Sequence, residues 1–68
     1  MTRAAIKVAA LAFARAVDDE AYARAMARER GHDAAWWLDR ANTHAARADI
    51  ALDAMTQALA AWRATQEK

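Results

Sequence analysis

The chain has 68 residues, no cysteine, no proline and one glycine, and its formal charge is +1. This length fits one domain at most. The lack of cysteine excludes disulfides and cysteine-based zinc sites, and ten cationic against nine acidic side chains do not by themselves predict nucleic-acid binding. A chain this small usually needs a partner chain for stability when it has no disulfide or metal, so we expect self-association or binding to another protein.

Alanine dominates the composition and predicts an all-α protein. It occupies 23 positions, whereas only 16 residues are larger hydrophobes. Because alanine has the highest helix propensity and proline is absent, helix is favoured along nearly the whole chain. Few large side chains must then supply most of the apolar burial.

The first predicted helix covers residues 3–30, with Thr2 as its expected N-cap. Arg28 and Arg30 lie in its last turn, where positive charge is favourable. Gly31 follows and suits the left-handed position that commonly ends a helix.

Asp33 is the expected N-cap of a second helix over residues 34–66, which leaves a turn at 31–33. A connection this short makes the two helices antiparallel neighbours. We therefore expect one domain over residues 1–68, an antiparallel two-helix hairpin that dimerises into a four-helix bundle.

Large apolar residues in the first helix fall on two roughly opposite sides at 100° per residue. One side carries Ile6, Phe13 and Val17, and the other carries Val8, Leu11, Tyr22 and Met26. A helix that is apolar on two sides needs neighbours on two sides. A hairpin supplies one neighbour, so a second copy or another protein must supply the other.

In the second helix, residues at spacings of three and four predict one core-facing stripe. The stripe consists of Trp37, Ala41, His44, Ala48, Leu52, Met55, Leu59 and Trp62. Asn42, Asp49 and Asp53 fall on the opposite, solvated side. From both helices, the predicted oligomer interface comprises Ile6, Leu11, Phe13, Val17, Trp37, Leu52, Met55, Leu59 and Trp62.

A second face of that helix is the candidate partner-binding surface. It carries Trp36, Arg40, Thr43, Arg47 and Ile50 at spacings of four, three, four and three. Aromatic and arginine residues are enriched at binding hot spots, and Trp36 and Arg40 could form a cation–π pair. Three interpretations stay open: a second packing surface within a homodimer, a site for another protein, or an arginine-rich contact to nucleic acid.

No catalytic or metal-binding constellation is predicted. His44 lies on the apolar stripe without the Glu-x-x-His motif of helical metal sites, and the Asp49–Asp53 pair lies on a solvated face. The chain lacks serine, cysteine and a glycine-rich loop. We therefore expect no cofactor, no membrane segment and a cytoplasmic, non-catalytic regulator, adaptor or inhibitor. Its size and composition are typical of bacterial or phage proteins.

Overall fold

The computed structural model describes residues 3–66, and all of them except Arg30 are helical. Helix α1 spans Arg3–Glu29, the 3-10 turn η1 spans Gly31–Asp33, and helix α2 spans Ala34–Gln66. No strand occurs in this part of the chain, so the prediction of an all-α protein is confirmed. The predicted cap at Thr2 lies outside the described residues.

The turn differs from the prediction at Gly31. This glycine lies in η1, and no residue of the described chain has a positive φ, so it is not a left-handed cap. Instead Arg30 leaves the helical region with φ −114° and ψ 76°, while its amide still donates to the carbonyl of Met26 at 2.9 Å. A tight 3-10 turn therefore reverses the chain without the conformation that requires glycine.

Asp33 also differs from its predicted role as the N-cap of the second helix. Its Oδ2 lies 3.3 Å from Nε of Arg30, and its Oδ1 is buried without a hydrogen-bond partner. Its amide donates to the carbonyl of Arg30 at 3.2 Å. The carboxylate thus closes the turn onto the end of α1 and does not cap α2.

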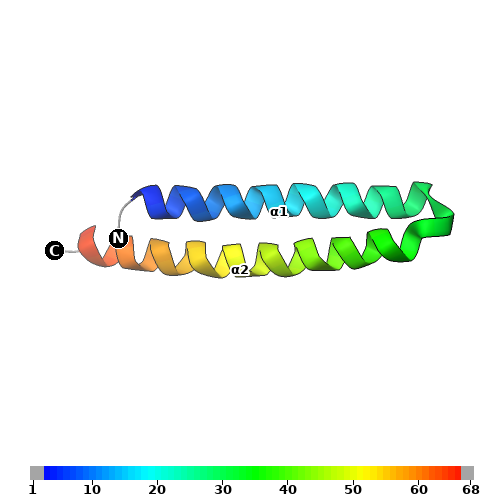
Figure 1. The fold of residues 1–68 in the computed structure, drawn as a ribbon. Coiled ribbons are helices and arrows are strands. Elements are labelled where there is room, and N and C mark those ends of the chain that lie inside the picture. The colour runs from blue at the N-terminus through cyan, green and yellow to red at the C-terminus, as the bar shows by residue number, and fades with distance from the viewer. Residues whose placement is uncertain (1–2, 67–68) are drawn as a thin grey trace.

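Helices α1 and α2 run side by side in opposite directions over most of their length (Figure 1). The Cα trace measures 57 × 13 × 11 Å, so the molecule is two helices wide and a single layer thick. No third element within residues 3–66 covers either broad side of this layer. Each helix therefore packs on its neighbour along one edge and keeps two flanks open.

Alanine forms the seam between the two helices. The buried hydrophobic residues are Ala16, Ala23, Ala41, Ala48, Ala51 and Ala58. The two in α1 are seven residues apart, and the four in α2 follow one another at spacings of seven, three and seven. Each set therefore lies on one side of its helix. Such small side chains permit close approach of the helix axes, and no large side chain of the described chain is fully buried.

The predicted stripe on α2 follows this seam except at Leu52 and Leu59. Ala41 and Ala48 are buried as predicted, but the seam continues through Ala51 and Ala58 rather than through Leu52 and Leu59. Leu52 is 42% exposed, so it does not lie in the seam between α1 and α2. The physical reason is that a narrow space between close helices accepts a methyl group and excludes the larger neighbour.

Candidate interaction site

The two broad sides of the layer carry different residues. We call one the groove face, defined by Val8 and Tyr22 of α1 and Trp36, Arg40, Thr43, Arg47 and Ile50 of α2. We call the other the leucine face, defined by Ile6, Phe13, Val17, Leu38, Leu52 and Leu59. Helical geometry places these sets on opposite flanks of the alanine seam. All five residues of the predicted partner-binding surface thus lie on one side of the molecule.

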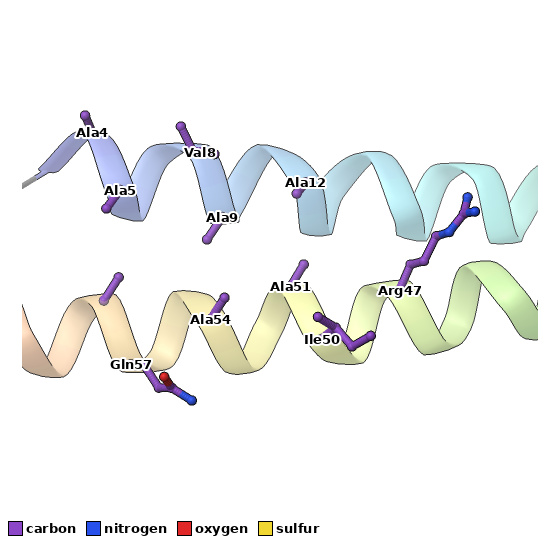
Figure 2. Close-up of a pocket in the computed structure, with 11 residues that line it drawn as sticks. Ala4, Ala5, Val8, Ala9, Ala12, Arg47, Ile50, Ala51, Ala54 and Gln57 are labelled. Carbon is purple, nitrogen blue, oxygen red and sulfur yellow. The ribbon is translucent and has the colours of Figure 1, made fainter.

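A groove of about 770 Å³ runs along the groove face between the helices. Most of its lining is alanine, and Figure 2 shows Ala5 and Ala9 of α1 facing Ala51 and Ala54 of α2. The full lining is Ala4, Ala5, Val8, Ala9, Ala12, Arg47, Ile50, Ala51, Ala54, Gln57 and Ala58. Sequence reasoning missed this groove, although runs of alanine at helical spacing on both helices could have indicated it.

Val8 and Ile50 project from the two rims of this groove. They are 67% and 71% exposed, the largest fractions among the large hydrophobic residues of the described chain. Burying such a side chain is worth about 1.5–3 kcal/mol, so each is a substantial unused source of binding energy. Their position beside alanine leaves two ridges with a depression between them.

Toward the turn, the groove face presents an aromatic and arginine row. The guanidinium carbon of Arg40 lies 4.8 Å from the centroid of the Trp36 ring, so the predicted cation–π pair is confirmed. Trp36 is 54% exposed and also meets Trp37 edge to face at 4.9 Å. Arg40 and Trp37 thus both contact the exposed Trp36 ring.

Arg40 and Arg47 form no ion pair with any residue in the range 3–66. By contrast, Arg24 pairs with Glu20 at 2.8 Å, in an i, i+4 arrangement that stabilises the helix. Figure 2 shows Arg47 reaching from α2 toward α1 at one end of the groove, where it is the sole charged lining residue. The groove therefore has an apolar floor and a cationic end.

Thr43 offers less to a partner than its place in the predicted partner-binding surface indicates. Its hydroxyl donates to the backbone carbonyl of Asp39 at 3.2 Å, within the same helix. A threonine bonded in this way presents mainly its methyl group. It separates the two arginines of the row and lines a small hollow with Asp39, Arg40, His44 and Arg47.

The leucine face holds most of the predicted oligomer interface. Ile6 and Leu59 line a shallow hollow together with Trp62, whose ring lies 5.6 Å from the guanidinium carbon of Arg3. Phe13 and Leu59 are half-buried, and Val17, Leu38 and Leu52 are exposed. These side chains come from both helices and lie on one side of the seam.

The other predicted interface residues are divided among different surroundings. Leu11 lies beside Val8 and Arg15, on the flank away from the leucine face. Met55, Trp37 and Trp62 are half-buried close to the seam. The nine residues therefore do not form one continuous surface.

Polar groups near the turn are only partly satisfied. Nδ1 of His44 and Nε1 of Trp37 are buried without a hydrogen-bond partner. On the outer side, Asn42, Asp49 and Asp53 are exposed as predicted, and Asp53 accepts a hydrogen bond from Nε2 of Gln57 at 2.9 Å.

The accessible surface of the protein is large for its size. It amounts to 5093 Å² for 7.5 kDa. A compact monomer of this mass exposes about 4,250 Å², so the excess is about 850 Å². That excess equals the area of about 800 Å² that each partner buries in a typical stable interface.

No family model, curated protein or solved structure matches this chain. Neither α1 nor α2 is apolar over a sufficient length to cross a membrane.

Proposed function

We propose that the protein is a non-catalytic protein–protein interaction module, a regulator, adaptor or inhibitor that acts as a homo-oligomer of helical hairpins. The observation that carries the proposal is a single layer of two helices with a different apolar surface on each side. One side suffices for self-association, and the other is left for a partner.

The leucine face is the surface we assign to self-association. Pairing two such faces buries Phe13, Val17, Leu38 and Leu52 and makes an antiparallel four-helix bundle. The excess surface of about 850 Å² is the amount one copy has to bury for an interface of standard size. On this flank Glu20 and Arg24 pair with each other, and Arg3 and Lys7 line the hollow at Ile6 and Leu59.

Sedimentation of the full chain at micromolar concentration tests the oligomer. We expect at least twice the 7.5 kDa chain mass, with full helicity by circular dichroism. A helical, cooperatively folded species of 7.5 kDa under these conditions contradicts the proposal.

The Trp36–Arg40 stack and the free guanidinium of Arg47 also favour a second candidate function, contact with single-stranded nucleic acid. Aromatic rings and arginine are typical of such surfaces. A labelled oligonucleotide distinguishes the two functions, because phosphate contacts weaken steeply as salt increases. Binding that falls with salt and is lost in Arg40→Glu with Arg47→Glu supports this second function.

A further inference from the structure

We propose that the groove binds one amphipathic α-helix of a partner protein, with a stripe of small apolar residues and acidic residues along one border of that stripe. This inference rests on the proposed function and names the chemistry of the partner. It uses the groove face only and leaves the leucine face to self-association.

The shape of the groove favours a helix as the occupant. Alanine side chains on both walls leave room for a third backbone to approach closely, and only a helix presents a continuous ridge at matching spacing. Ala5 and Ala12 on α1, like Ala51 and Ala58 on α2, are seven residues apart. On α2 the whole lining extends from Arg47 to Ala58, about three helical turns or roughly 17 Å.

The charge at the end of the groove favours acidic residues on that helix. Arg47 lies at the groove itself, and Arg40 lies seven residues away on the same flank of α2. A partner helix with two carboxylates about two turns apart can pair with both, while Val8 and Ile50 bracket its apolar stripe. Trp36 extends the contact beyond Arg40.

The same charge disfavours a second copy as the occupant. Two grooves facing each other bring two copies of Arg47 into one apolar interface, and neither groove has an acidic lining residue to pair with them. Like charges in a desolvated interface cost several kcal/mol. On the leucine face the cations Arg3 and Lys7 lie at the end farthest from the turn, beside Ile6 and Leu59.

Two synthetic helical peptides of about 20 residues test the proposal. Both have a stripe of alanine and leucine; one has glutamates seven positions apart at its border, and the other has lysines there. Fluorescence anisotropy with the full chain should show the glutamate peptide binding about tenfold more tightly, equivalent to about 1.4 kcal/mol. Equal affinity, or no binding of either peptide, overturns the proposal.

Matched variants locate the site. Ala54→Gln puts a longer neutral side chain into the groove and should weaken binding of the glutamate peptide about tenfold, whereas Ala46→Gln, on the outer side of α2, should not. Arg47→Gln should reduce the preference for glutamate over lysine, because only Arg40 is left to pair with the peptide, and Arg63→Gln should leave the preference unchanged. An unaltered affinity in Ala54→Gln places the peptide elsewhere and overturns the assignment.

The same samples, examined by sedimentation, separate this inference from the proposed function. If Ala54→Gln halves the oligomer mass, the groove holds a second copy and the inference is wrong. If the parent chain is a folded monomer that still prefers the glutamate peptide, the groove assignment stands and the oligomer proposal fails. Displacement of the glutamate peptide by single-stranded DNA identifies the groove as a nucleic-acid site and overturns the inference.

Discussion

The ring of Tyr22 on α1 meets the ring of Trp37 on α2 edge to face, with centroids 5.8 Å apart and planes inclined at 73°. Trp37 also meets Trp36 edge to face, at an angle of 88°. These three rings join the two helices at the end nearest the turn. The buried residues of the seam are alanines, so this cluster adds an aromatic contact between the helices.

Trp37→Ala should therefore destabilise the fold much more than Trp36→Ala. We expect a loss of about 2–3 kcal/mol for the half-buried Trp37, since removing a buried aromatic side chain leaves a cavity. The exposed Trp36 should cost less than about 1 kcal/mol. Urea unfolding followed by circular dichroism measures both, and equal losses would show that Trp37 does not connect the helices.

Ala41 offers a test of how closely the helices pack. Its side chain is 0% exposed, so Ala41→Leu should force the helices apart and cost about 1–3 kcal/mol. Ala46→Leu is the control, because Ala46 is exposed and leucine has nearly the same helix propensity as alanine. If both variants unfold at the same urea concentration as the parent, the seam is looser than the structure indicates.

The sequence predicts the two helices well, but it predicts poorly which residues of each helix lie in the seam. Proline-free, alanine-rich segments on either side of Gly31 are enough to place two helices. The seam at Ala51 and Ala58 could not be found by searching for apolar contrast, because Leu52 and Leu59 next to them give the stronger signal. In close helix packing the small residue lies inside and the large one flanks it. This is the reverse of the usual expectation that the larger apolar residue is the buried one.

The candidate site is also predicted only in part from the sequence. Spacing alone brings Trp36, Arg40 and Arg47 to one flank of the second helix, and the structure shows the predicted stack of two of them. The groove beside them depends on which side of α1 lies across the seam. That relation is a property of the assembled pair, so no pattern within one helix could reveal it.

Leu52 and Ile50 provide a matched pair for locating the self-association surface. They lie on opposite faces of the same helix, and both are exposed. Leu52→Lys should lower the oligomer mass and abolish the rise of melting temperature with protein concentration that obligate association predicts. Ile50→Lys should leave both unchanged, and the reverse result would assign self-association to the groove face.

Asp49→Ala and Asp53→Ala should be nearly silent in thermal unfolding, within about 0.5 kcal/mol, because both side chains are exposed. Loss of like-charge repulsion at i, i+4 offsets the hydrogen bond that Gln57 donates to Asp53. Leu59→Ala and Trp62→Ala should each cost about 1–3 kcal/mol, since both are half-buried on or beside the leucine face. Comparable stability in all four variants would reverse the inner and outer assignments.

Arg40→Glu with Arg47→Glu should retain helicity and oligomer mass but abolish binding of the glutamate peptide, because repulsion replaces attraction at both ends of the charge row. The control is Arg28→Glu with Arg63→Glu, which changes the net charge equally at exposed positions outside the groove. A collapse of the oligomer in the first variant alone would identify the row as internal packing.

An interior of methyl groups also has a thermal consequence. Unfolding raises the heat capacity in proportion to the apolar surface that becomes hydrated, and a seam of six alanines hydrates little. The heat-capacity increment per residue should then lie below the usual range of about 12–15 cal/mol/K. Differential scanning calorimetry of the oligomer measures it.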